Sequence, residues 1–375
     1  MSPEKRYPFL VPLLSTLSDK RHRTVMGLFI AAIAVTGQAR SIAIATTVAR
    51  WLGTRLDSAL NRFYRLLRNH RVEYLEFTAQ WARLLVRGPG RHLTIAIDWT
   101  EWHSDLRLLV AGVVVGKRGI PLFVQGFEKQ VRMRSQNQRE NTFLRVLADV
   151  LRRAEVTTTI LCDRGFRRVS WINLLQQLNL GFVVRLMDDV FVEAAPEVRL
   201  ALRHILLTQG EILDLGQVPL RSDAAVTVRV IGYWAPGRHE PWWLATNEIG
   251  SAAQILKAYD RRMTVEEMFR DSKGKRFGVK LVWTQFTDPE ALARFCTLLA
   301  VALLIWTLTG RAAVAKSPSL RLHSRSKGPR QSFVTIGLRI CTLEKIPIAM
   351  TPRSIARWLE APTLRRLGKF SLGGK

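Results

Sequence analysis

Between residues 91 and 187 the chain alternates short apolar strands with amphipathic helices, in an order that permits few folds. Three strands come first, followed by a helix, a strand, a helix and a last strand. In chain order these segments are LTIAID (93–98), LRLLVAGVVV (106–115), IPLFVQGF (120–127), NTFLRVLADVLRRA (141–154), TTTILCD (157–163), residues 170–179 and GFVVRLM (181–187). The glycine-bounded turn at 116–119 joins the second and third strands into a hairpin. Apolar strands separated by helices predict an α/β fold, with a mixed sheet flanked by helices.

The periodicity changes on both sides of this region, and it divides the chain into five parts. Residues 1–90 have helical spacing and end at Gly88-Pro89-Gly90, and residues 91–187 form the first part of a core. Short alternating segments then predict a β-strand insertion over 188–248, and helices return over 249–310 as the second part of the core. The last part, 311–375, is basic and loop-like, with short helices expected near 333–341 and 352–360.

The N-terminal part contains a basic helix after the turn at Leu52-Gly53-Thr54. Arg62 and Arg65 are predicted to be exposed, and Phe63, Leu66 and Leu67 to face inward. One interpretation is a helix-turn-helix-like unit that presents this helix to DNA. The alternative, a plain helical bundle with an arginine-rich exposed face, fits the pattern equally well.

The strongly positive charge of the chain favours a negatively charged binding partner. Lys and Arg number 57 against 30 Asp and Glu, which gives a formal charge of +27 spread over the whole length. Such a surface is most easily tolerated beside a polyanion, and an aromatic-rich folded chain favours nucleic acid over an acidic membrane. The longest uncharged run, residues 295–310, has 16 residues, so we expect a buried helix and no membrane contact.

Three scattered cysteines, Cys162, Cys296 and Cys341, are too few for a disulfide framework or a zinc site. They indicate a reducing compartment. The first residues lack the apolar core and cleavage site of a signal peptide. We therefore expect a cytoplasmic protein.

Three carboxylates stand where metal chemistry would need them. Asp98 and Asp163 each end a strand, and Glu266 lies on the helix expected to cover the sheet. Each acid alone is more simply a strand-end cap or a partner in a surface ion pair. Converging together, they can hold two Mg²⁺ ions about 3.5–4 Å apart, which stabilise the attacking and leaving oxygens of a phosphoryl transfer. No His/Cys cluster offers a different metal site.

Glu266 belongs to a regular pattern with three other side chains. Tyr259, Arg262, Glu266 and Lys273 have the spacing Y-x2-R-x3-E-x6-K. On an α-helix these directions fall within about 60° of one another. One carboxylate between cations suits a metal beside a phosphodiester, although a solvated helix face would show a similar charge pattern.

On these residues the chain resembles DDE transposases of the IS4 family, which have a ribonuclease H-like catalytic core. The resemblance covers roughly residues 40–310, and SALNRFYRLLRN (58–69) is more weakly similar to the N-terminal region of that family. The matching motif residues are Asp98 in AIDWT, Asp163-Arg164-Gly165-Phe166, and Tyr259, Arg262, Glu266 and Lys273.

The resemblance implies that Asp98, Asp163 and Glu266 are the catalytic metal ligands, for Mg²⁺ with Mn²⁺ as a substitute. It implies phosphate contacts for Tyr259, Arg262 and Lys273. The implied partners are transposon terminal inverted repeats and target DNA, bound by a homodimer in the synaptic complex. The implied reaction is hydrolysis at the transposon ends followed by joining of the 3′-OH ends to target DNA.

Several members of the family pass through a DNA hairpin, in which a flipped base stacks on a tryptophan of the β insertion. Trp242 and Trp243 are adjacent here, and neighbouring strand residues point to opposite faces, so only one can reach DNA. Trp242 fits the family position better. Alternatively, both are core aromatics.

Two other functions remain open at this point. One is a catalytically inactive DNA-binding relative of a transposase, against which the presence of all three acids argues. The other is a ribonuclease H-like nuclease without strand transfer. The Tyr-Arg-Glu-Lys pattern and the β insertion favour a transposase over it.

Overall fold

The computed structural model describes residues 10–86, 91–101, 105–115, 118–129, 133–195, 198–221, 224–266, 268, 284, 286–321 and 331–343. Its elements are α2 (Leu10–Leu14), α3 (Lys20–Thr36), α4 (Ser41–Leu52), α5 (Leu56–Arg68), α6 (Tyr74–Leu85), β1 (His92–Glu101), β2 (Leu106–Val115), β3 (Arg118–Glu128), α7 (Met133–Ala154), β4 (Thr157–Cys162), η1 (Arg164–Phe166), α8 (Val169–Gln177), β5 (Gly181–Leu186), β6 (Phe191–Ala195), β7 (Val198–Ala201), η2 (Leu202–His204), β8 (Ile212–Arg221), β9 (Ala225–Tyr233), β10 (Trp242–Thr246), α9 (Ala252–Asp260), η3 (Arg261–Met263), α11 (Pro289–Lys316), η5 (Pro318–Arg321) and α12 (Phe333–Leu343).

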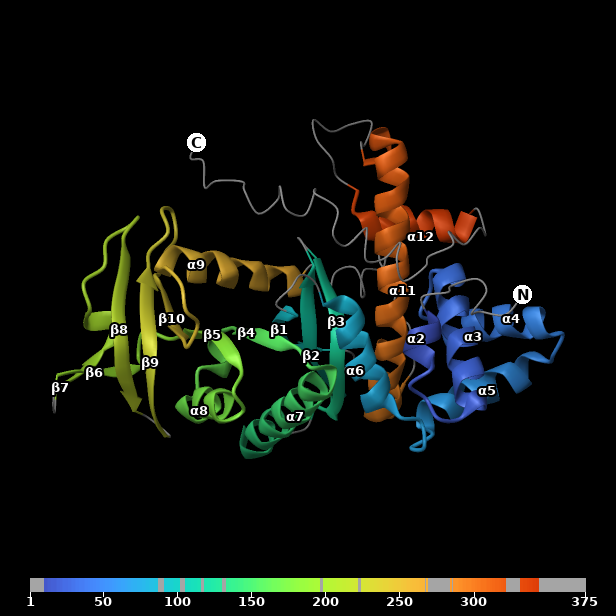
Figure 1. Ribbon diagram of the computed structural model, residues 1–375, viewed down its shortest axis with the longest axis horizontal. Coiled ribbons are helices and arrows are strands. Elements are labelled where there is room, and N and C mark those ends of the chain that lie inside the picture. Colours follow the sequence, from blue (N-terminus) through green and yellow to red (C-terminus); the bar gives the residue numbers. More distant parts are fainter. Residues whose placement is uncertain are drawn as a thin grey trace.

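All the strands of this described part join one sheet, in the order β3-β2-β1-β4-β5-β10-β9-β8-β6-β7 (Figure 1). β1 is antiparallel to β2 and parallel to β4, and β4 is parallel to β5. This confirms the mixed, ribonuclease H-like sheet. The strands of the insertion continue the same sheet, because β10 pairs antiparallel with β5.

Helices cover both faces of the sheet. On one face, Phe143 of α7 packs against Phe123 of β3, with ring centroids 5.0 Å apart. On the other face, Met268 lies against Gly112 of β2 and the start of α11 lies against Gly126 of β3. A Cβ at Gly126 would come within 2.2 Å of the carbonyl oxygen of Pro289, so only glycine permits this close approach.

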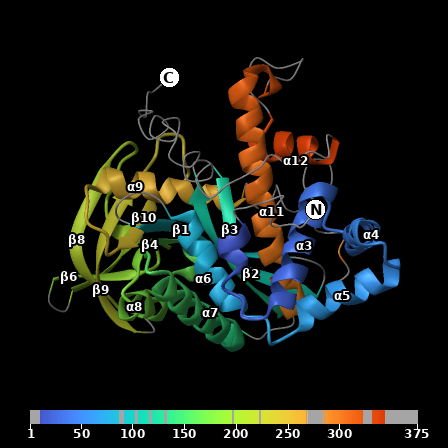
Figure 2. The same cartoon turned by 45° about the vertical axis from the view of Figure 1, so that its right-hand side comes forward.

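The apolar run forms α11, which is the central helix of the protein. It runs between the sheet and the N-terminal helices and also packs on α12 (Figures 1 and 2). By length and composition α11 could cross a membrane, but 94% of its most apolar window is buried inside the protein. Gly310 on α11 and Gly337 on α12 let the two backbones touch, since a Cβ at either would overlap the other helix. The expectation of a buried helix is confirmed.

The N-terminal helices pack as predicted in their main features. Phe63, Leu66 and Leu67 of α5 are buried, with Phe63 in contact with Phe29 of α3 and Phe295 of α11. Thus α5 is fixed by one apolar stripe, and its other faces are exposed. The three cysteines are buried and free.

One local prediction is wrong. Residues 259–266 do not form one continuous α-helix, because α9 ends at Asp260 and the 3₁₀ turn η3 follows before Thr264. Lys273, the turn at 88–90 and the short helix expected at 352–360 lie outside the described residues. The helix expected at 333–341 is confirmed as α12.

Candidate active site

The register of two parallel strands brings Asp98 and Asp163 together. Ile97 of β1 is paired with Cys162, the last residue of β4, so Asp98 and Asp163 both follow this last parallel pair. The prediction that Asp98 ends its strand is wrong, because β1 continues to Glu101 through its pairing with β2. Asp98 Oδ1 accepts a hydrogen bond from the Trp99 amide (2.8 Å). Asp163 Oδ1 accepts one from the Gly165 amide (2.8 Å), which caps η1. Each carboxylate is therefore oriented by the backbone just after it.

The environment of Asp98 disfavours its charged form. Burial and, next, the negative charge of Asp163 raise the pKa of Asp98 to about 6, with Glu266 adding a smaller effect in the same direction. The guanidinium of Arg262 and the Trp99 hydrogen bond oppose this rise. A half-buried carboxylate facing two others is the arrangement that a bound cation would relieve.

Arg262 contacts both Asp98 on β1 and Glu266, which follows η3. Its Nη1 lies 3.3 Å from Asp98 Oδ2 and its Nη2 lies 3.6 Å from Glu266 Oε1. The arginine side chain is only 13% exposed, so these contacts are partly shielded from water. One guanidinium therefore stands between two of the three carboxylates.

Arg262 occupies positions beside two carboxylates that a metal ion would need. Among the described residues, no group of three or more Asp, Glu, His or Cys side chains is arranged to hold an ion. The donor chemistry suits Mg²⁺, because all three groups are hard carboxylate oxygens. Asp98 and Asp163 are already adjacent, whereas Glu266 is half exposed and is paired with Arg262, which also contacts Asp98.

Tyr259 and Trp242 form the wall next to the acids. Their rings meet edge to face with centroids 5.2 Å apart, and the Arg185 guanidinium lies 5.9 Å from the Trp242 ring. Tyr259 is buried, which raises the pKa of its hydroxyl to about 12, so it remains protonated at neutral pH. The phenol thus has its proton available as a hydrogen-bond donor.

The two adjacent tryptophans face opposite ways, as the alternation of the strand predicts. Trp243 is 2% exposed and packs over Gly232, where a Cβ would lie 2.5 Å from its ring. Trp242 is only partly buried. The core role therefore belongs to Trp243, and Trp242 lies on the side of Tyr259.

Two arginines near the acids were missed by the sequence analysis as site residues. Arg185 Nη2 lies 2.6 Å and Arg164 Nη1 lies 3.2 Å from the same oxygen of Glu240. Arg164 is part of the motif that follows Asp163, and Arg185 interrupts the apolar strand β5. A charged residue in an apolar strand was the signal that would have identified Arg185.

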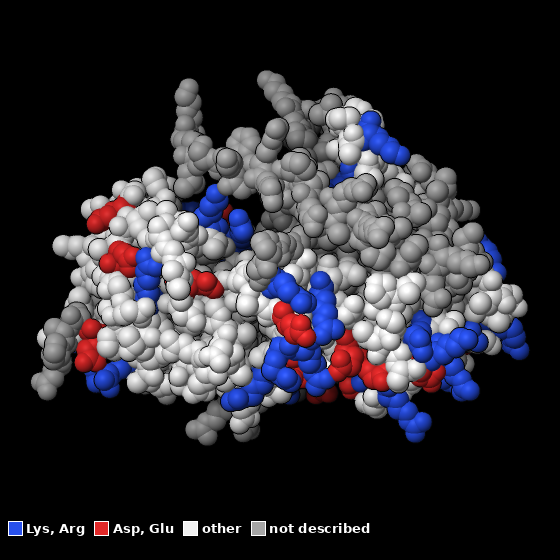
Figure 3. All heavy atoms as spheres, in the orientation of Figure 1, with Lys and Arg blue, Asp and Glu red and all other residues white. Residues whose placement is uncertain are grey.

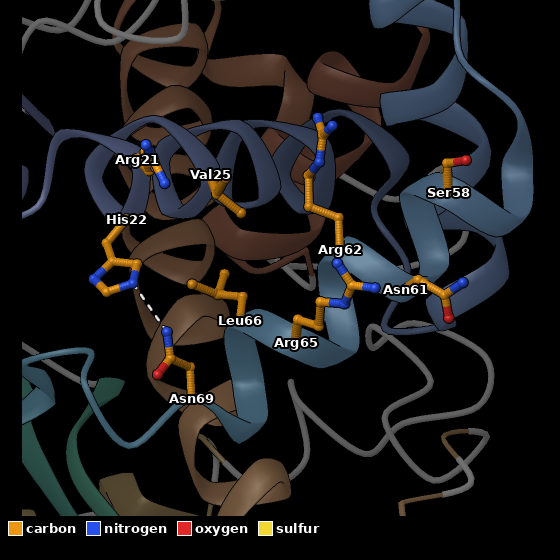
Figure 4. A pocket seen from close by; sticks show the side chains of 9 residues that line it. All are labelled: Arg21, His22, Val25, Ser58, Asn61, Arg62, Arg65, Leu66 and Asn69. Atoms are coloured by element: carbon orange, nitrogen blue, oxygen red, sulfur yellow. Dashed lines mark hydrogen bonds between the residues drawn. The ribbon is translucent and has the colours of Figure 1, made fainter.

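A second basic site lies between α3 and α5, far along the chain from the acids. Figure 4 shows this pocket of about 360 Å³, where Asn69 bonds His22 (2.9 Å). Within the described ranges, none of its arginines has an acidic partner. Lys and Arg side chains also gather over these helices at the right of Figure 3. The lining residues are Arg21, His22, Val25, Ser58, Asn61, Arg62, Arg65, Leu66 and Asn69.

Comparisons with known proteins identify the family of the chain. The sequence profile of the family described as "Transposase DDE domain" matches residues 114–305, just over half of the chain, and includes Asp163 and Glu266. No curated protein matches the chain. Among solved structures, the chain is similar to a piggyBac transposase in a synaptic complex with hairpin DNA. The identity is 12%, the TM-score 0.44, and the alignment covers 95% of this chain and 78% of that chain.

Proposed function

The chain belongs to the transposase DDE domain family, and on that premise we propose that it is an insertion-sequence transposase of the IS4 type. It binds terminal inverted repeats, cleaves the transposon ends and joins the 3′-OH ends to target DNA. One observation carries the proposal. Asp98 on β1 and Asp163, the residue after β4, stand side by side, and Arg262 contacts both Asp98 and Glu266.

In this proposal Asp98, Asp163 and Glu266 hold Mg²⁺. When bound, the ions stabilise the charge on the attacking and leaving oxygens of the phosphodiester. Arg262 is released from the carboxylates and turns to the DNA, where a guanidinium can hold phosphate oxygens in a bidentate manner. Tyr259 donates its hydroxyl proton in the same region, and Lys273, outside the described residues, supplies a further positive charge.

Two further surfaces complete the proposed contact with DNA. Trp242 stacks on an unpaired base if cleavage passes through a hairpin, a contact typically worth about 1–3 kcal/mol. The pocket with Arg62 and Arg65 contacts the backbone of the terminal repeat, because its cations lack protein partners in the described structure. Coordinated cleavage at two ends is the reason for proposing a homodimer on DNA.

The decisive experiment uses labelled transposon-end DNA with purified full-length protein, with and without Mg²⁺. A denaturing gel separates nicked, hairpin and joined products. Wild-type protein should give Mg²⁺-dependent nicks and joined products. Asp98→Ala, Asp163→Ala and Glu266→Ala should each abolish cleavage and leave DNA binding largely intact. Glu155→Gln, which removes an exposed acid that pairs with Arg91, is a matched control and should cleave normally.

Each alternative function has its own outcome in this assay. Nicks without joined products would indicate a nuclease that lacks strand transfer. Tight binding without any Mg²⁺-dependent product would indicate an inactive DNA-binding relative. Near wild-type cleavage by Asp163→Ala would refute the metal assignment.

A further inference from the structure

A buried carboxylate on α7 has no part in the site as described so far. Glu140 is 2% exposed, in a position where acids occur almost only with partners. Its Oε1 accepts hydrogen bonds from Trp99 Nε1 (2.8 Å) and Gln136 Nε2 (3.0 Å). Its Oε2 accepts a hydrogen bond from Arg168 Nη2 (2.7 Å), and the two charged groups form an ion pair.

The partners of Glu140 belong to the two segments that carry Asp98 and Asp163. Trp99 directly follows Asp98 on β1. Arg168 follows the turn η1 that Asp163 caps, and it stands at the N-terminus of α8. The Glu140 carboxylate on α7 therefore connects Trp99, which follows Asp98, with Arg168, which follows Asp163 in the chain.

Glu140 acts from the opposite face of the sheet. Asp98 and Trp99 are consecutive in a strand, so their side chains point to opposite faces. Asp98 meets Arg262 on one face, whereas Trp99 meets α7 on the other. The indole of Trp99 is also fixed by Phe127 at 5.4 Å and by Arg107 above its ring at 5.3 Å. Because Glu140 touches neither Asp98 nor Asp163, its effect on them must be indirect.

We propose that Glu140 is a positioning residue, which sets the separation of the Asp98 and Asp163 carboxylates by holding Trp99 and Arg168 on one carboxylate. This inference deepens the proposed function and rests on it. Mg²⁺ demands near-ideal ligand geometry, so a small change in the distance between two ligands weakens binding. Loss of a residue that orients metal ligands typically weakens metal affinity by about 10- to 100-fold.

The test measures metal binding separately from catalysis. Glu140→Gln keeps the size of the side chain but removes the charge that holds Arg168, and Trp99→Phe removes the indole N–H donor while keeping a smaller aromatic ring. For each full-length variant, Mg²⁺ is titrated and the rise in unfolding temperature is recorded, because a ligand that binds the folded state raises it. DNA nicking is measured at the same Mg²⁺ concentrations.

Both variants should bind DNA normally and should need roughly tenfold more Mg²⁺ for half of the maximal effect in each measurement. The double variant should show less than the sum of the two effects, because both changes act on one hydrogen-bonded unit. Asp149→Asn is the matched control: it lies on the same helix and loses its ion pairs with Arg152 and Arg153, away from the aspartates. Its Mg²⁺ titration should match that of wild type.

Three results would overturn the inference. One is an unchanged Mg²⁺ titration for folded Glu140→Gln and Trp99→Phe, and a second is an equal shift for Asp149→Asn. If Glu140→Gln does not fold, Trp99→Phe alone decides the question. A wild-type protein that does not respond to Mg²⁺ would overturn the metal assignment and this inference together. A wild-type response with unchanged variants would refute only the role of Glu140.

Discussion

The ionised carboxylate of Asp98 should destabilise the folded protein when no metal is bound, and its replacement by Asn should relieve this cost. Burial and the nearby charge of Asp163 raise the pKa of Asp98 from 3.8 to about 6. The folded state therefore binds a proton more tightly than the unfolded state. As pH rises from about 4 to about 6, the wild-type protein loses the stability that this proton provides.

The size of the effect follows from the two pKa values. A shift of one unit corresponds to about 1.4 kcal/mol, so the full shift amounts to roughly 3 kcal/mol. By the linkage relation, the wild-type protein loses about 2 kcal/mol of this stability between about pH 4.5 and about pH 7. Asp98→Asn cannot titrate at this position. Its free energy of unfolding, measured relative to wild type, should therefore increase by about 2 kcal/mol across that range.

Urea unfolding of both proteins in EDTA, at several pH values in this window, measures the difference directly. Asp149→Asn is the control, because hydrogen bonds from Arg153 and Arg152 lower the pKa of Asp149 below 3.8 and so below the window. Its difference from wild type should stay flat. The reasoning is refuted if the difference for Asp98→Asn is also flat or decreases with rising pH.

The remaining predictions concern the two adjacent tryptophans and the basic pocket. Trp243→Ala should destabilise the protein by about 3–5 kcal/mol in urea unfolding, because its ring is fully packed, whereas Trp242→Ala should cost much less stability. Trp242→Ala should slow hairpin formation more than first-strand nicking on a denaturing gel, and equal slowing of both steps would contradict the stacking role. Arg62→Ala and Arg65→Ala should each reduce the slope of log K against log salt by about 0.9 in binding titrations with duplex DNA. Arg152→Ala on α7 has the same charge change, and a similar loss of slope for it would argue against a specific role of the pocket.

The sheet core could be predicted from sequence because its signals are local. Apolar runs predicted β1, β4 and β5, and Asp98 and Asp163 come directly after the last parallel pair of β1 and β4, although β1 itself continues to Glu101. Placing Asp98 beside Asp163 required only that both strands run in the same direction. The opposite faces of Trp242 and Trp243 followed in the same way from the alternation of a strand.

The parts that could not be predicted depend on contacts between distant residues. The turn η3 breaks the helix before Glu266 without a Gly or Pro to mark it. The position of Arg262 between two carboxylates depends on how that turn packs on β1. Glu140 did leave a signal, since it precedes Phe143 and Leu144 by one helical turn and so lies on the apolar stripe of α7.

The junction of β10 with β5 has a consequence for how the insertion can change in length. Trp242 lies on the strand that borders the core, and growth of the sheet beyond it proceeds through β9, β8 and β6 to the outer strand β7. Strands can therefore be gained or lost at that outer edge without displacing the indole from the aspartates. A longer or shorter insertion is therefore compatible with an unchanged spacing between Trp242 and the two aspartates.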